Sequence, residues 1–137
     1  MVNNILAGCG VHHIALGVAD LERSIHFYSQ LGFTPVYSWK SGERTIAMID
    51  LGDGSCLELF SDCTGQPNGE KTAGSFLHLA LRVKDSAAAF DLALQAGAKP
   101  KSQPAAGQLS CEPPLPVVVS FVYGPDGEQI EFFETRG

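Results

Sequence analysis

Basic residues are scarce in this chain. It has 9 lysines and arginines against 15 aspartates and glutamates, which gives a formal net charge of -6 at pH 7 over 137 residues. A nucleic-acid-binding protein needs a stripe or patch of positive charge to meet the phosphates, and this sequence contains no such run. The composition therefore argues against nucleic acid as a partner and favours a small-molecule ligand.

Cysteines are few, and no apolar run is long. The chain has neither the cysteine density of a disulfide scaffold nor a Cys-x-x-Cys metal spacing in its four cysteines, Cys9, Cys56, Cys63 and Cys111. The N-terminus lacks a basic segment followed by an apolar one, and nothing later approaches the roughly 20 apolar residues of a membrane-spanning helix. We therefore expect free thiols in a cytoplasmic protein that is neither exported nor bound to a membrane.

The chain contains an internal repeat. Four pairs of identical residues are each separated by 65 positions: His13 and His78, Asp20 and Asp85, Gly32 and Gly97, and Pro35 and Pro100. Such self-similarity indicates two copies of one supersecondary unit. We predict a single domain over residues 1–137, with a first module at about 11–61, a linker at about 62–75 and a second module at about 76–135.

Each copy predicts a strand, a helix and three further strands, which makes the fold class α+β. Asp20 and Asp85 are expected to cap the helices, and Gly32 and Gly97 to accept the left-handed backbone beyond them. The later strands are expected at 34–40, 44–51 and 55–60, and at 98–102, 116–123 and 128–134. The helix positions expected to face the sheets are Leu21, Ile25, Tyr28 and Leu31, and Phe90, Ala93 and Leu94.

The second copy is longer than the first. His13 and Glu58 are 45 positions apart, whereas His78 and Glu131 are 53 apart, so the second copy holds 8 additional residues. We expect the insertion to be the proline-rich stretch 101–116, as a loop that borders the mouth of the site and acts as a lid. The alternative is an ordinary solvated connector.

Two histidines and two glutamates form a candidate metal site. On a strand His13 shares a face with Ala15 and Gly17, away from a continuous aliphatic face that belongs under the helix, and His78 is placed in the same way in the second copy. Glu58 and Glu131 likewise project opposite large apolar neighbours. A single such Glu needs no function, but a set of four suits a divalent ion of borderline hardness.

Other polar residues near these strands receive different predictions. His12 is expected on the opposite face from His13, and His26 on the first helix, so neither is expected to bind the metal. Cys56 shares a face with Glu58, although an isolated cysteine is more often a small buried hydrophobe. Arg82 shares a face with His78, and we predict that it pairs with an anionic group of the substrate; a solvated arginine near a strand end is the alternative.

Taken together, these motifs resemble the vicinal oxygen chelate superfamily, which includes glyoxalase I. The resemblance covers nearly the whole chain and rests on the segments 13–16, 20–24, 27–28, 31–33, 57–59, 78–81 and 125–131. It implies two βαβββ modules whose sheets form a curved cup around a metal, with one ligand from each motif, at His13, Glu58, His78 and Glu131. It also implies nickel or zinc, with manganese, cobalt or iron as alternatives, and a homodimer, because these sites often form between subunits.

The resemblance implies a metal-dependent lyase or isomerase of the glyoxalase I type. Such an enzyme abstracts a proton next to a metal-chelated pair of substrate oxygens, with Glu131 or Glu58 as the general base. Bacterial relatives commonly carry Arg where Gly17 stands and Asn where Asp62 stands, and both hold glutathione. Their absence disfavours glutathione here unless a cation such as Arg82 or Lys101 compensates.

Three other functions of the same superfamily remain as alternatives. Ring-cleaving dioxygenases use iron held by two histidines and one carboxylate, so a fourth ligand argues against that activity. Bleomycin-resistance proteins bind a drug without catalysis and need no metal ligands, so the intact ligand set disfavours this reading too. Antibiotic-modifying thiol transferases usually show three ligands.

Overall fold

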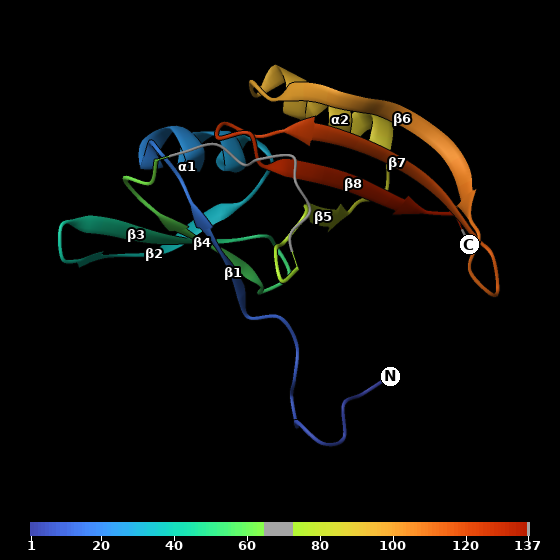
Figure 1. Ribbon diagram of the computed structural model, residues 1–137, viewed down its shortest axis with the longest axis horizontal. Coiled ribbons are helices and arrows are strands. Elements are labelled where there is room, and N and C mark those ends of the chain that lie inside the picture. The colour runs from blue at the N-terminus through green and yellow to red at the C-terminus, as the bar shows by residue number, and fades with distance from the viewer. Residues whose placement is uncertain (65–72, 137) are drawn as a thin grey trace. The chain divides into compact units, whose positions relative to one another are not determined.

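The computed structural model describes residues 1–64 and 73–136. The chain forms two compact units, residues 1–64 and 65–137 (Figure 1). The predicted linker at about 62–75 includes residues 65–72, which lie outside the described residues. Each unit holds one helix and one four-stranded sheet, so the predicted α+β class with two βαβββ units is confirmed.

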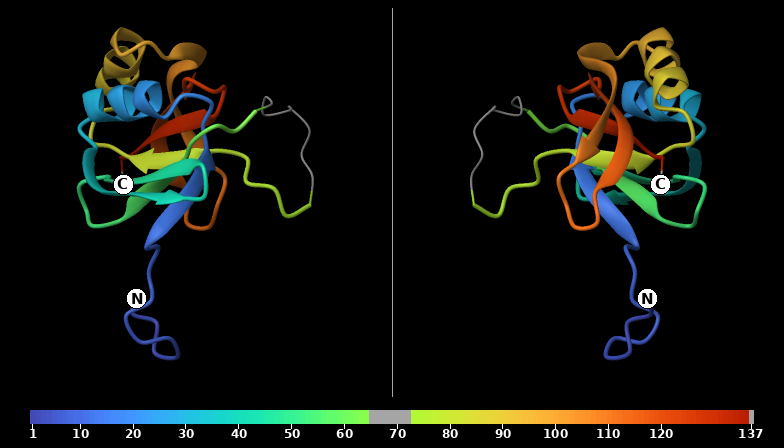
Figure 2. Two further views of the ribbon diagram at one scale, coloured as in Figure 1. Left: turned by 90° about the vertical axis from the view of Figure 1, so that its left-hand side faces the viewer. Right: turned by 90° about the vertical axis from the view of Figure 1, so that its right-hand side faces the viewer.

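The first unit follows the predicted order of elements. They are β1 (His13–Gly17), α1 (Leu21–Gln30), β2 (Thr34–Ser41), β3 (Arg44–Asp50) and β4 (Cys56–Phe60). The strands lie in the order β1-β4-β3-β2, with β1 parallel to β4 and the other pairs antiparallel. Residues 1–12 contain no helix or strand and extend away from the sheet (Figure 2). The first unit is thus a complete βαβββ module.

The second unit repeats this topology. Its elements are β5 (Leu79–Arg82), α2 (Ser86–Gln95), β6 (Lys99–Leu109), β7 (Leu115–Tyr123) and β8 (Gln129–Thr135). The strands lie in the order β5-β8-β7-β6, again with one parallel pair, β5 with β8. α2 packs across β6, β7 and β8 on one face of the sheet (Figure 1). The other face of this sheet carries His78 and Glu131.

Both helices begin and end where the sequence predicts. The Asp20 carboxylate accepts the backbone N–H of Arg23 at 3.1 Å, and the Asp85 carboxylate accepts that of Ala88 at 3.0 Å. These caps satisfy donors that have no partner within the helix. Gly32, at φ +92°, follows the end of α1 in the predicted left-handed backbone. Within the described residues, no helix is long and apolar enough to cross a bilayer.

The buried stripes on the helices differ in part from the prediction. Tyr28 on α1 and Phe90 and Ala93 on α2 are buried as expected. Leu21, Ile25 and Leu31 are only half-buried, and Leu94 is also intermediate. The buried face of α1 is instead formed by Ser24, Phe27 and Tyr28, which are spaced i, i+3, i+4. This face is rotated about the helix axis relative to the predicted stripe.

The predicted lid loop at 101–116 is wrong, because most of that stretch is a β-hairpin. β6 continues to Leu109 and pairs with β7, for example Ala105 with Val119 and Gly107 with Val117. β6 is three residues longer than β2, β7 is two longer than β3, and the turn between them is three residues longer, which accounts for all eight extra residues. Prolines are tolerated in this strand because β6 is at the edge of its sheet.

A buried polar network under α2 was not foreseen from the sequence. Glu134 is 8% exposed, and its carboxylate accepts the backbone N–H of Ser86 at 2.8 Å and the Arg136 side chain at 2.7 Å. The Ser86 hydroxyl donates to the Phe132 carbonyl at 2.8 Å. Glu134 therefore ties β8 to the N-terminus of α2, on the opposite face of the sheet from Glu131.

Candidate metal-binding site

The two units hold their predicted ligands at the same position of the same pair of strands. In the first unit Ala15 on β1 is the register partner of Glu58 on β4. In the second unit Ala80 on β5 is the register partner of Glu131 on β8. His13 and His78 each lie two residues before that alanine, so strand alternation places each imidazole on the face that its glutamate occupies.

In each unit the imidazole faces the carboxylate. His13 Nε2 lies 3.6 Å from Glu58 Oε1, and His78 Nε2 lies 3.2 Å from Glu131 Oε1. The exposures of the side chains are also matched, at 38% and 36% for the histidines and 13% and 12% for the glutamates. We call His13 with Glu58 the first half-site and His78 with Glu131 the second half-site.

The chemistry of these pairs fits a divalent metal ion. Two ligands at roughly 2.0–2.2 Å from one ion are about 2.8 to 3.6 Å apart for right-angled or tetrahedral arrangements, a span that includes both observed distances. In both half-sites the nitrogen that faces the carboxylate is Nε2, so the ligand geometry is the same. Among residues 1–64 and 73–136, no group of three or more His, Cys, Asp or Glu side chains is gathered into a metal-binding cluster. Each unit thus brings together one histidine and one glutamate.

A second histidine contacts the first half-site. His12 Nδ1 lies 2.9 Å from His13 Nδ1, and the two rings are nearly perpendicular, at 85°. The expectation that His12 turns away from His13 is therefore wrong. The reason is that β1 begins only at His13, so strand alternation does not govern His12. His26 lies on α1 near Gln30, as expected.

An aromatic ring and a cation accompany the second half-site. Phe121 on β7 is the register partner of Glu131, and its ring packs edge-on against His78 with the centroids 5.4 Å apart. The Lys101 ammonium lies 4.8 Å from the centre of the same Phe121 ring. These three side chains come from β6, β7 and the residue just before β5. No local motif in the sequence predicts their contact.

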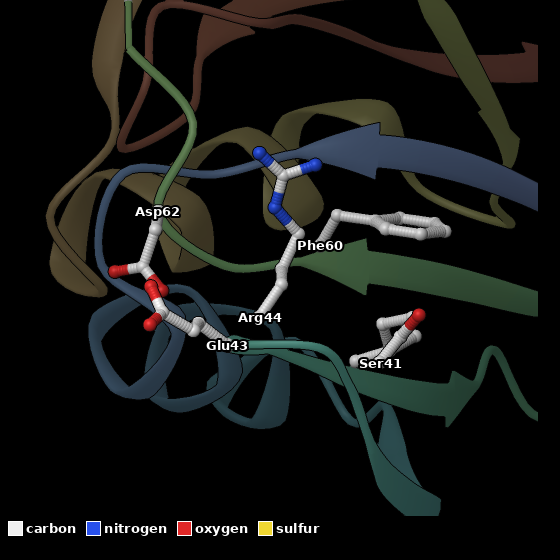
Figure 3. A pocket seen from close by; sticks show the side chains of 6 residues that line it. Ser41, Glu43, Arg44, Phe60 and Asp62 are labelled. Atoms are coloured by element: carbon white, nitrogen blue, oxygen red, sulfur yellow. The ribbon is translucent and has the colours of Figure 1, made fainter.

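A hollow of about 590 Å³ opens on the first unit. It is lined by Ser41, Glu43, Arg44, Ile46, Phe60 and Asp62. Phe60 follows Glu58 by two residues on β4 and therefore lies on the same face. The carboxylates of Glu43 and Asp62 lie at one end of the hollow, the Phe60 ring lies at the other, and Arg44 stands between them (Figure 3). No sequence motif predicts this hollow, because its lining comes from two segments, 41–46 and 60–62, that are distant along the chain.

Gly17 and Asp62, where the chain departs from glutathione-binding relatives, have structural reasons for their identity. A Cβ at Gly17 would lie 2.8 Å from Cys63 Sγ, so a side chain there requires Cys63 to move. Asp62 adopts a left-handed backbone at φ +59°, which Asp and Asn tolerate better than most residues, and its carboxylate accepts the Ser61 hydroxyl at 2.7 Å. The packing of this chain is therefore adapted to the absence of an arginine at position 17.

The four cysteines and Arg82 are the remaining residues for which the sequence makes a prediction. All four cysteines are free, and Cys56 is buried, as expected. Burial raises the pKa of the Cys56 thiol above its ordinary value, with smaller contributions from the negative charges of Asp50 and Asp53. Arg82 ends β5 as an exposed residue whose register partner is Phe133, so its pairing with a substrate stays a prediction.

Comparisons with known proteins agree with this architecture. Residues 10–132 match the pattern of the Glyoxalase/Bleomycin resistance protein/Dioxygenase superfamily. Among solved structures, a glyoxalase family protein from Enterococcus faecalis is 21% identical with a TM-score of 0.75, covering 91% of this chain and 97% of that one. A glyoxylase/bleomycin resistance protein/dioxygenase domain from Frankia sp. EAN1pec is 19% identical with a TM-score of 0.70, covering 93% and 98%.

Glyoxalase I from Zea mays is also similar. It is 19% identical with a TM-score of 0.69, and the match covers 90% of this chain and 44% of that one. No curated protein matches the chain. At these identities the likeness to solved structures shows the fold alone. The class of protein is defined by two βαβββ units, each of which carries a histidine and a glutamate on one face of its sheet. The superfamily match gives the name of this class. The chain belongs to the Glyoxalase/Bleomycin resistance protein/Dioxygenase superfamily.

Proposed function

We propose that this protein is a metal-dependent lyase or isomerase of the glyoxalase I type. The observation that carries the proposal is the equivalence of the two half-sites, each with a histidine Nε2 facing a glutamate Oε1 at 3.2 to 3.6 Å. His13, Glu58, His78 and Glu131 are proposed as the ligands of one divalent ion, nickel or zinc. Two carboxylates balance the charge of such an ion, and two imidazoles suit its borderline hardness.

The reaction proposed is proton abstraction from a carbon next to two vicinal substrate oxygens. A divalent ion, when bound, would acidify that C–H bond and stabilise the negative charge that forms on the oxygens. Glu131 or Glu58 accepts the proton and returns it to the neighbouring carbon, a role worth roughly 100- to 10,000-fold in rate. The exposures of 13% and 12% keep both carboxylates accessible to a small molecule.

The substrate proposed is a small molecule other than glutathione conjugates. Gly17 brings no cation, and Cys63 Sγ would lie 2.8 Å from any Cβ at that position. Asp62 adds a negative charge where the glutathione-binding relatives carry a neutral amide. Arg82, exposed at the end of β5, is proposed to pair with an anionic group of the substrate. The active form is proposed to be a homodimer, in line with the superfamily.

Metal analysis of protein purified without chelator tests the ligand assignment. We expect about one divalent ion for each pair of modules in the wild-type protein. Glu58→Ala and Glu131→Ala should each lose most of that metal, because each removes a charged ligand. His26→Ala serves as the matched control, since His26 lies on α1, and it should keep the wild-type metal content.

A substrate screen tests the reaction. The metal-loaded protein is offered hemithioacetals, acyl-CoA epimerase substrates and catechols. Turnover of a substrate by proton transfer supports the proposal, whereas ring cleavage of a catechol would place the chain with the dioxygenases. Tight binding of a drug by protein that takes up no metal would identify a binding protein instead. Equal metal loss in all three variants would reject the ligand set.

A further inference from the structure

We infer that Lys101 and Phe121 form a subsite beside the second half-site for an anionic group of the substrate; this inference rests on the proposed function. The Lys101 ammonium lies 4.8 Å from the centre of the Phe121 ring. That ring in turn lies 5.4 Å from the His78 ring, at an interplanar angle of 88°. The phenyl ring therefore lies beside both the Lys101 ammonium and the proposed metal ligand His78.

A β-bulge explains why Lys101 lies on this face. Pro100 pairs with Val122, whereas the next pairing joins Ser102 to Phe121, so Lys101 and Ser102 together oppose one residue of β7. Such a bulge re-aims the side chain of the extra residue. Val122 is fully buried on one face of the sheet. Phe121, its neighbour on β7, points to the opposite face and is the register partner of Glu131. Lys101 thus reaches the face of Glu131.

Charge balance explains why a cation is needed there. A divalent ion with Glu58 and Glu131 carries no net charge, so it offers an anionic substrate little attraction beyond direct coordination. The chain as a whole is negative, at -6. An ammonium beside the site compensates for both effects, because opposite charges attract more strongly near a partly desolvated surface than in bulk water. The subsite is therefore selective for a carboxylate or another anion.

The first unit offers a natural comparison for this subsite. It has the same bulge, between Pro35 and Tyr37, opposite Met48. The residue that corresponds to Lys101 is Val36, at the same offset of 65 that relates His13 to His78. Lysine is therefore not required to build the bulge, and its presence in one copy alone points to a role in binding.

Two chelating probes that differ by one carboxylate test this subsite. Benzohydroxamate and 4-carboxybenzohydroxamate both bind a metal through two vicinal oxygens, and their affinities are measured by calorimetry on the nickel-loaded protein. We expect the wild-type protein to favour the carboxylated probe about 10-fold, equivalent to about 1.4 kcal/mol. Lys101→Met should abolish that preference while it keeps the affinity for benzohydroxamate. Lys40→Met, which removes an exposed cation from β2, is the control.

The outcomes separate this inference from the proposed function. If both probes bind but the wild-type protein shows no preference, or if Lys40→Met and Lys101→Met act alike, the subsite is rejected and the metal site stands. If the protein takes up no nickel, the proposed function is rejected and the subsite with it. Transfer of the preference to a Lys101→Met variant that also carries Val36→Lys would instead show that any nearby cation suffices, which rejects a built subsite.

A separate observation concerns the first half-site, where we infer that His12 is a positioning residue for His13. The two Nδ1 atoms are 2.9 Å apart, so one of them carries the hydrogen and the other accepts it. Binding of a metal at His13 Nε2 requires the neutral tautomer that is protonated at Nδ1. His12 Nδ1 is then the acceptor, and it fixes both the tautomer and the ring orientation of His13.

The backbone holds His12 in place for this role. The His12 carbonyl accepts the backbone N–H of Cys56 at 2.9 Å, which ties the residue just before β1 to the first residue of β4. The His12 ring meets the His13 ring edge-on, with the centroids 5.2 Å apart. His13 therefore has Glu58 on its Nε2 side and His12 on its Nδ1 side, the arrangement of a metal ligand with an outer hydrogen-bond partner.

Metal affinity and the histidine tautomer together test the role of His12. His12→Ala should weaken nickel binding about 10- to 100-fold, the usual effect of removing an outer partner. His12→Asn should recover part of that loss, because an amide oxygen also accepts a hydrogen bond. Nitrogen-15 NMR of the metal-free protein should show more of the Nε2-protonated tautomer at His13 in His12→Ala than in the wild type.

Each result for His12 decides the question. Unchanged affinity and an unchanged tautomer of His13 in His12→Ala reject the inference. A loss of metal as complete as in His13→Ala would show that His12 binds the metal directly, which rejects the positioning role too. His26→Ala is the control, and it should match the wild type in both measurements.

Discussion

The two half-sites share one scaffold and differ in what surrounds them. Each pairs a histidine with a glutamate at the same register of a parallel strand pair, and each has a β-bulge after a proline on the outermost strand. Around the first, the bulge presents Val36 opposite Met48; around the second, it presents Lys101 opposite Phe121. The repeat thus keeps each histidine beside its glutamate, while the residues around the two pairs differ.

The difference extends along the neighbouring strands. In the first unit the Glu58 face carries large exposed apolar side chains, with Tyr37 68% and Trp39 40% exposed, as well as the hollow beyond Phe60. In the second unit the Glu131 face carries Lys101 and Arg82. The residues beside the glutamate therefore differ between the two units, with exposed aromatic side chains near Glu58 and two cations near Glu131.

The largest effect is expected when the two carboxylates are compared directly. Glu58→Gln and Glu131→Gln are each loaded with metal at saturating concentration and assayed on a substrate that the screen identifies. The variant that lacks the general base should lose roughly 100- to 10,000-fold in kcat, whereas the other should mainly lose metal affinity. Equal falls in kcat for both variants would contradict a division of labour between the half-sites.

A smaller effect is expected from the buried network under α2. Glu134→Ala should lower the free energy of unfolding by about 1 to 3 kcal/mol, because it leaves the Ser86 N–H and the Arg136 side chain without their acceptor. Urea denaturation measures the change, and metal content should not change. Ser61 is the corresponding residue in the first unit; its uncharged hydroxyl accepts the Thr45 N–H and donates to Asp62, so Ser61→Ala should cost less.

The aromatic support of His78 gives the next effect. Phe121→Met makes the second half-site resemble the first, where Met48 holds the equivalent position. We expect nickel affinity to fall roughly 2- to 12-fold, in line with about 0.5 to 1.5 kcal/mol for an aromatic contact. Met48→Phe is the reverse exchange, and a loss of the same size there would show that bulk alone, rather than contact with His78, is responsible.

The smallest effect concerns Cys56, which lies beside the first half-site, where the second unit has Gln129. Burial, with smaller contributions from Asp50 and Asp53, raises the pKa of its thiol, so less of the reactive thiolate is present at a given pH. Iodoacetamide should modify the exposed Cys9 and Cys111 first, and Cys56 should need a higher pH to reach the same rate. Mass spectrometry of the labelled peptides measures this order, and early labelling of Cys56 would contradict it.

The sequence by itself determined the topology and the faces of the strands on which the two histidines and two glutamates lie. A constant offset of 65 residues, the helix caps Asp20 and Asp85, and strand alternation around His13 and His78 are local signals, and the structure places each as predicted. Local signals are sufficient here because capping and alternation depend only on neighbouring residues. They also located Glu58 and Glu131 on the correct faces.

Only the tertiary structure decided the surroundings of those ligands. The proline-rich stretch 101–116 suggested a loop, yet β6 is an edge strand, where a missing N–H costs no ladder hydrogen bond on the open side. The contact of Lys101 with Phe121 depends on a bulge, and the contact of His12 with His13 depends on where β1 begins. These features arise from pairing between distant segments, which residue type and spacing along the chain do not specify.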